Sequence, residues 1–176
     1  MNVLRASFFR WVWICLCITS FTACSTLDYH HTQVRLDRQA RWLLLPLVNH
    51  SETPQAGQRA AAVAELLLRR AGIEQLERYP AVDDTLEPDD ERVRQEALTW
   101  AKQQPARYAI TGSVEEWHYK SGPDAEPAVA LHLQVIELAS GQVVWSAGGA
   151  KTGWGRESVS VLGQQLIREL LATLPR

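Results

Sequence analysis

Residues 128–151 read Ala-Val-Ala-Leu-His-Leu-Gln-Val-Ile-Glu-Leu-Ala-Ser-Gly-Gln-Val-Val-Trp-Ser-Ala-Gly-Gly-Ala-Lys, and this stretch decides the fold. Its first half alternates large apolar residues with small or polar ones, the apolar set being Val129, Leu131, Leu133 and Val135. An alternation of period two is typical of a β-strand with one face in a core. Ser140-Gly141-Gln142 separates this strand, 128–139, from a second apolar run over 143–151, which predicts an antiparallel hairpin.

The segments upstream of this hairpin supply further strands. Residues 108–119 predict a third strand, and the turn-forming segment 120–127 joins it to the hairpin as an antiparallel meander. The continuous apolar run 41–48, which ends at Asn49, predicts a strand buried on both faces, where Pro46 marks an edge or a bulge. Residues 73–78 predict a short strand that would be parallel to it.

Three helices are predicted between and after these strands. Residues 55–71 place alanines and leucines at spacings of three and four and are followed by Gly72, a typical helix-ending glycine. A second helix runs from about 89 to 103, and a third from 158 to 173 carries a leucine stripe. The order β-α-β-α-β-β-β-α predicts an α/β (α+β) fold, with three helices on a mixed sheet of about five strands, in a single domain over 41–176.

The N-terminal residues form a separate unit. Two arginines, an apolar run over 11–18 and small residues at Thr22-Ala23 are typical of a secretory signal peptide, here residues 1–23. The run is shorter than the about 20 apolar residues of a spanning helix, so a transmembrane anchor is the weaker alternative. Phe21-Thr22-Ala23-Cys24 resembles the bacterial lipobox. We therefore expect Cys24 to carry lipid, residues 24–40 to be a tether, and the domain to sit on the periplasmic face of the outer membrane.

Charge and motif content argue against a nucleic-acid partner and against an enzyme. The net charge is −2, and residues 83–96 hold seven acidic residues against two arginines. No H-E-x-x-H, P-loop or G-x-S-x-G motif occurs, and all three cysteines lie within the first 24 residues. We expect no catalytic residue, metal site or cofactor. Glu115 and Glu116 are expected on opposite faces of a strand, and so not as one acid–base pair.

Two sets of residues remain as candidates for function. The acidic set consists of Asp124 and Glu126 in the turn 120–127, followed by Asp83, Asp84, Asp89 and Asp90. Ordinary turns and solvated helix starts also use such residues, but in a ring of identical subunits each acid would be repeated around a channel and would favour cations. The second set is Trp154, between two glycines, with Arg156. Trp154 either caps the core over the terminal helix or anchors the domain among lipid head groups.

Several strings resemble the PelC family, the outer-membrane lipoproteins of Pel exopolysaccharide export. They are the lipobox, Trp-Leu-Leu-Leu-Pro-Leu-Val-Asn over 42–49, Val-Glu-Glu-Trp-His-Tyr-Lys-Ser-Gly over 114–122 and Gly-Trp-Gly-Arg-Glu-Ser over 153–158. The resemblance implies a fold like the N-terminal domain of TolB, a homo-oligomeric ring that is dodecameric, and a PelB-like porin and scaffold as partner. It also implies an electronegative funnel for a cationic polymer of amino sugars. The alternative is a monomeric envelope lipoprotein that activates a peptidoglycan synthase, which a tether as short as 25–40 disfavours.

Overall fold

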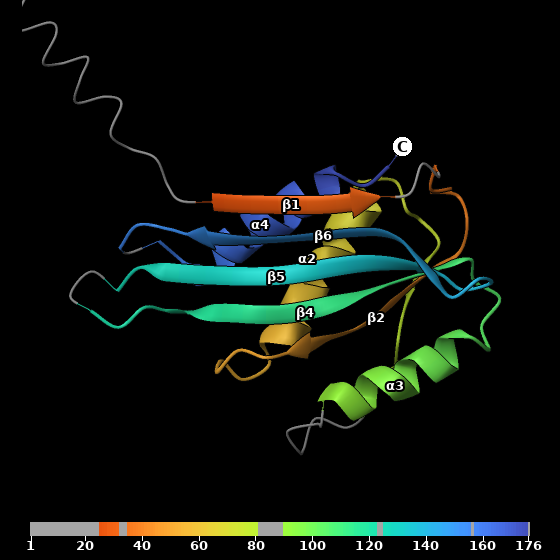
Figure 1. Cartoon of the computed structure of the whole chain (residues 1–176), viewed down its shortest axis with the longest axis horizontal. Helices are drawn as coiled ribbons and strands as arrows, with labels where there is room; N and C mark the ends of the chain where they lie inside the picture. The colour runs from red at the N-terminus through yellow and green to blue at the C-terminus, as the bar shows by residue number, and fades with distance from the viewer. Residues whose placement is uncertain (1–24, 32–34, 81–89, 123–124, 156, 176) are drawn as a thin grey trace, which may run out of the picture.

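The computed structural model describes residues 25–31, 35–80, 90–122, 125–155 and 157–175. These residues form one six-stranded mixed sheet with helices on both sides (Figure 1). The elements are β1 (Ser25–His31), β2 (Trp42–Asn49), α2 (Ala56–Arg70), β3 (Leu76–Arg78), α3 (Asp90–Ala101), β4 (Tyr108–Tyr119), β5 (Pro127–Glu137), β6 (Gln142–Thr152) and α4 (Val159–Ala172). The strand order across the sheet is β1-β6-β5-β4-β2-β3. The predicted fold class and the three predicted helices are confirmed.

The predicted meander is the centre of the sheet. β4 pairs antiparallel with β5, and β5 pairs antiparallel with β6. Gly141 in the β5–β6 turn has a φ of 70°, a left-handed conformation that glycine adopts without steric cost. The turn between β4 and β5 is closed by a hydrogen bond from Lys120 N to the Glu126 carbonyl at 2.8 Å. The alternating pattern over 128–135 therefore places its apolar side chains on one face of the sheet.

β2 is parallel to both of its neighbours, β3 and β4. Its pairing with β4 shifts register between Leu44 and Leu47, so the bulge alternative for Pro46 is the one the structure adopts. The Thr111 hydroxyl donates a hydrogen bond of 2.8 Å to the Pro46 carbonyl. This bond satisfies a buried carbonyl group at the point where the regular ladder is interrupted.

The sheet has one more strand than the sequence predicted, and the expected tether is the reason. β1 occupies residues 25–31 and pairs antiparallel with β6, from Ser25 opposite Lys151 to His31 opposite Trp145. Leu27 and Tyr29 alternate with polar residues in this segment, but the side chains of residues 25–30 are all exposed, so no buried apolar face marks β1 in the sequence. Backbone hydrogen bonds to the edge of β6 define the strand. The tether prediction is thus wrong for residues 25–31, and the order becomes β-β-α-β-α-β-β-β-α.

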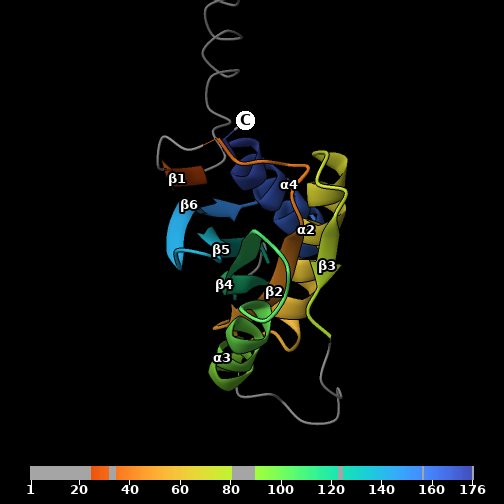
Figure 2. The ribbon, with the colours of Figure 1, turned by 90° about the vertical axis from the view of Figure 1, so that its right-hand side faces the viewer.

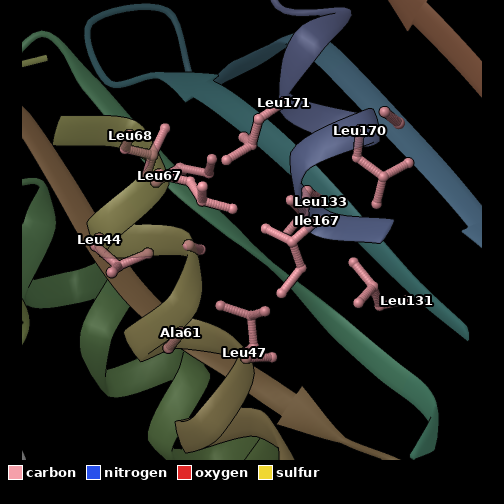
Figure 3. Close-up of a cluster of buried hydrophobic side chains, with 14 of the residues drawn as sticks. Leu44, Leu47, Ala61, Leu67, Leu68, Leu131, Leu133, Ile167, Leu170 and Leu171 are labelled. Atoms are coloured by element: carbon pink, nitrogen blue, oxygen red, sulfur yellow. The ribbon is translucent and has the colours of Figure 1, made fainter. Parts of the chain in front are cut away.

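The main core lies between one face of the sheet and the helices α2 and α4, which pack side by side (Figure 2). Figure 3 shows leucines of α2, α4, β2 and β5 meeting in this layer. Trp117 and Trp145, predicted to be core residues, are 1% and 0% exposed. A tryptophan buries about 150–250 Å², so these two side chains contribute a large part of the apolar burial. None of the helices in the described ranges is long and apolar enough to cross a membrane.

α3 lies on the opposite face of the sheet, where it covers β2. Ala97 and Ala101 of α3 are completely buried against a second, smaller core with Leu43 and Leu45 of β2 and Ala109 of β4. α3 has no comparable packing on β5, β6 or β1. Figure 1 looks onto this face, with α2 and α4 behind the sheet and α3 along its lower edge. We call the α3-side surface of β4, β5, β6 and β1 the open face.

Candidate functional site

One end of the sheet carries exposed aromatic side chains. Trp154 and Tyr119 are 57% and 48% exposed, and Val161, in the first turn of α4, is 47% exposed. The backbone N–H of Val159, the first residue of α4, donates to the Tyr119 hydroxyl at 3.2 Å, so the start of α4 lies next to the end of β4. The structure thus places Trp154 on the surface and not as a cap over the core. We call this region, Tyr119, Trp154 and Val161, the Trp154 end.

The loop that presents Trp154 is fixed to the β4–β5 hairpin. Gly153 N donates to the Pro127 carbonyl at 2.9 Å, and Glu157 N donates to the Trp154 carbonyl at 3.0 Å. A Cβ on Gly153 would overlap the Glu157 carboxylate and lie 2.9 Å from Pro127 Cγ, so any larger residue here would force the Glu157 side chain or the hairpin to shift. The hairpin and the Trp154 loop therefore occupy the same end of the sheet.

Glu126, the sequence-predicted acid of the hairpin that the structure describes, belongs to this same end. Glu126 is half-buried, and its carbonyl closes the hairpin turn. Ala125 beside it has a φ of 42°. Asp124 lies outside the described residues, as does Arg156. The structure therefore brings Glu126 and Trp154 to one end, as candidate residues from two different loops.

β1 starts at this end as well. Ser25 pairs with Lys151, three residues before Trp154 in the chain. Cys24, the residue before Ser25 in the chain, lies outside the described residues. From this end β1 runs along β6 toward the turn between β5 and β6 (Figure 1).

The second predicted acidic group falls at the start of α3. Asp83, Asp84 and Asp89 lie outside the described residues, and Asp90 is the first residue of the helix. The next residue, Glu91, accepts hydrogen bonds from the Arg94 guanidinium at 2.5 Å and from the Gln95 amide at 3.0 Å. These hydrogen bonds, that of Arg94 foremost, lower the pKa of Glu91 to about 2.

The open face carries two carboxylates that the sequence analysis separated. The pairing of β4 with β5 skips one residue between Val114 and Glu116, which is a β-bulge at Glu115. The Ser113 hydroxyl donates to the Glu115 carboxylate at 2.5 Å, and Ser113 pairs with His132. Glu116 pairs with Ala130, which lies on the same face of β5 as His132. Both carboxylates are exposed on the open face, so their predicted separation is wrong.

His132 lies at the centre of this acidic surface. Its partial burial lowers the pKa of the imidazole, and the negative charge of Glu115 opposes that shift. A Cβ on Gly148, on the neighbouring strand, would lie 3.4 Å from His132 Cδ2, so the imidazole leans over the glycine. Across the described ranges, no three His, Cys, Asp or Glu side chains group as metal ligands would. The open face is therefore an acidic surface with a partly buried histidine.

Taken together, the fold and these surfaces define a small α+β domain with helices over one sheet face, a largely open acidic second face, and an aromatic end. No family model and no curated protein matches the sequence. Among solved structures, lipoprotein GNA1162 from Neisseria meningitidis has the same fold, with a TM-score of 0.57, 17% identity, and coverage of 76% of this chain and 96% of that chain.

A nearer similarity is to the PelC dodecamer from Paraburkholderia phytofirmans. Its TM-score is 0.73 at 35% identity, over 87% of this chain and 99% of that chain. A single-residue variant of the same dodecamer, in a second crystal form, gives the same TM-score and identity over 100% of its length. This chain belongs to the PelC family.

Proposed function

We propose that this chain is an outer-membrane lipoprotein whose copies form a ring on the periplasmic face and guide cationic Pel exopolysaccharide to its export porin. The observation that carries the proposal is the 35% identity, over 87% of the chain, to a PelC that was solved as a dodecamer. A relative of this similarity over nearly its full length makes the same assembly the first expectation. The proposal includes palmitate on Cys24, a location at the outer membrane and Pel exopolysaccharide as the polymer.

The lipid and Trp154 support one orientation on the membrane. Cys24 precedes Ser25, and Ser25 pairs with Lys151 at the end of β6 that leads to Trp154. A lipidated Cys24 would therefore hold the Trp154 end against the bilayer, where an exposed tryptophan is favoured at the head-group level. Arg156, two residues further on, would face anionic head groups. With β1 beginning directly after Cys24, the domain lies on the membrane instead of hanging from a long tether.

In this proposal the residues of the acidic set line the ring's channel and attract the cationic polymer without binding it tightly. An exposed carboxylate gains up to about 1 kcal/mol from one cationic group in water. A ring repeats each carboxylate in every subunit, so the field along the axis adds up while each single contact stays weak. Glu126 and Asp124 are the first candidates, because Glu126 lies at the Trp154 end and Asp124 precedes it by two residues in the chain. Asp83, Asp84, Asp89 and Asp90, near and at the start of α3, come second.

The partner in this proposal is a PelB-like porin and scaffold, and the chain itself performs no chemical step. A monomeric activator of a peptidoglycan synthase is disfavoured, because such a protein needs chain between lipid and domain to reach across the periplasm. Here β1 takes up residues 25–31. The short distance from lipid to sheet favours a protein that works at the membrane surface.

The test is polymer export by a strain in which variants replace the native protein. Asp124→Asn with Glu126→Gln should lower the exported cationic polymer while the amount of membrane-bound protein stays the same. Glu74→Gln, which neutralises an exposed carboxylate at the opposite end of the sheet, is the matched control and should export normally. Normal export by the double variant would remove these two residues from the proposal. Normal export by a strain without the protein would contradict the proposed function itself.

A further inference from the structure

The open face lacks large side chains along its middle. β6 and β5 contribute mainly small residues there, namely Ser146, Gly148, Ala150, Ala128 and Ala130. His132 and Gln134 are half-buried beside them. Figure 2 shows the sheet from its end, with α2 and α4 on one side and no described element over β5 and β6 on the other. A surface of this shape allows a helix to approach the backbone closely.

Carboxylates flank this strip on both sides. Glu116, with Glu115 beside it, stands on β4, and Asp28 stands on β1, where it pairs with Gly148. All three are exposed, and no lysine or arginine of the described residues shares the open face of these four strands. By register, Glu116 and Asp28 lie three strand spacings apart across the sheet and two residues apart along the strands. Together these offsets give a separation of about 16 Å.

The outer side of α2 has the complementary pattern. Arg59, Ala62, Leu66 and Arg70 follow one another at helical spacing, and all are exposed. Leu66 is 53% exposed, and this is a large apolar side chain at the centre of the row. Among the described residues no ion pair engages Arg59 or Arg70, whereas Glu65 pairs with Arg69 and Arg78. At about 1.5 Å per residue, Arg59 and Arg70 are about 16 Å apart along the helix.

We propose that the α2 row of one copy packs across the open face of the next copy, with Leu66 over the strip around Gly148 and the two arginines beside Asp28 and Glu116. The proposal rests on the ring assembly of the proposed function. The charges are opposite, and the two separations agree at about 16 Å. Two different surfaces of the same chain meet, which makes the contact heterologous, the type of contact from which cyclic rings are built.

The orientation on the membrane and the size of the face agree with this contact. With the Trp154 end against the bilayer, the strands run away from the membrane, so the open face and the helical layer face sideways toward neighbouring copies. Four strands of this length offer a footprint of about 600 Å². That is near the roughly 800 Å² that each partner buries in a stable interface.

The experiment compares three forms of the full-length lipidated chain, solubilised in detergent, by their native mass. The face variant carries Asp28→Arg and Glu116→Arg, and the helix variant carries Arg59→Glu and Arg70→Glu. Each variant alone places like charges against each other at every contact, so its association should weaken by at least about tenfold. Co-expressed, the two variants should assemble again in alternation, because each reversed surface then meets its complement. The single substitutions Glu116→Arg and Glu74→Arg change the net charge by the same amount, and only Glu116→Arg should weaken assembly.

Restored assembly on co-expression would confirm the contact, since two misfolded variants could not rescue each other. If native chain assembles and the face variant assembles equally well, the open face is not the interface, while the proposed ring stands. If the face variant assembles normally but exports less polymer, the acids contact polymer and the inference is overturned. If native chain is monomeric in membranes and in detergent, both this contact and the proposed ring are contradicted.

Discussion

Glu115 and Glu116 are neighbours in the chain and lie on the same face of β4, because the pairing with β5 skips one residue between Val114 and Glu116. The pairing of β4 with β2 ends at Val114, so the bulge affects only the hairpin with β5. Its consequence is local, yet it gives the open face two carboxylates instead of one. Trp117, just beyond the bulge, returns to the core, where it is 1% exposed.

Deleting Glu115 should leave the fold intact. The deletion makes Val114 and Glu116 consecutive, opposite Leu131 and Ala130, which is the regular antiparallel register. We expect a change of less than about 1 kcal/mol in the free energy of unfolding, measured with urea, because removing exposed surface residues costs little. Deleting Thr111 is the control: its pairing with β5 is regular, so its loss would move the side chains on one side of the deletion to the opposite face of the sheet. Equal destabilisation by the two deletions would contradict the bulge.

Gly163→Ala should destabilise the domain. A Cβ at Gly163, on α4, would overlap the ring of Trp117, which is buried and cannot move away freely. Overpacking of this kind costs about 1–3 kcal/mol, although alanine is the better helix former. Gln164→Ala, one residue further along the same helix, is the control and should have little effect. A Gly163→Ala protein as stable as the native one would show that α4 does not lie this close to the sheet.

His132 should make stability depend on pH. Because burial lowers the pKa of its imidazole below the ordinary value of 6.5, the unfolded chain binds the proton more readily than the folded one. The contribution of the neutral His132 imidazole to the free energy of unfolding is complete above about pH 6.5 and is lost as the pH falls through the lowered pKa. As the pH is lowered from 7.5 to 5.5, the free energy of unfolding, measured with urea, should therefore fall more for the native domain than for a His132→Asn variant. Parallel pH profiles for the two proteins would contradict the burial of this imidazole.

Most of the fold could be predicted, and the exceptions share a physical cause. The strand over 128–135 and the leucine stripe of the last helix follow from burial, which leaves a periodic apolar pattern in the sequence. β1 is exposed on both faces and held by backbone hydrogen bonds, so it leaves no such pattern. The bulge at Glu115 is a property of pairing with another strand and is not visible in one strand alone. The open face depends on both β1 and the bulge at Glu115, so it could not be predicted from the sequence.

Of the candidate site, the sequence could single out Trp154, but neither its exposure nor its location. A tryptophan between two glycines fits either a core cap or a surface anchor, and the 57% exposure of its side chain in the folded domain separates these alternatives. The joint position of Ser25, Glu126 and Trp154 at one end depends on sheet register. Register between distant segments is set by tertiary pairing.

Trp154→Ala should weaken the association of the lipidated protein with liposomes severalfold and leave its stability nearly unchanged. The side chain is 57% exposed, so its removal empties no core cavity. Tyr29→Ala is the matched control, because Tyr29 is also 57% exposed but lies within β1, away from the Trp154 end. Unchanged liposome binding by the Trp154 variant, or an equal loss in the Tyr29 variant, would contradict the proposed orientation.

Cys24→Ala should abolish retention in the outer membrane. Without a thiol at this position no lipid can be attached, and none of the described helices could anchor the chain in its place. Cell fractionation with an antibody measures the distribution. Cys17→Ala, within the signal peptide, is the control and should leave the processed protein in the membrane. A Cys24→Ala protein that still fractionates with the outer membrane would contradict lipidation at this residue.

The central claim is that copies of this chain form a ring, and native mass measures it most directly. Light scattering across a concentration series should be applied to the domain 25–176 and to the lipidated full-length chain in detergent. The account predicts a closed assembly of defined mass, near the twelve copies of the related PelC dodecamer, in at least the lipidated form. A monomer at every concentration in both forms would contradict the account.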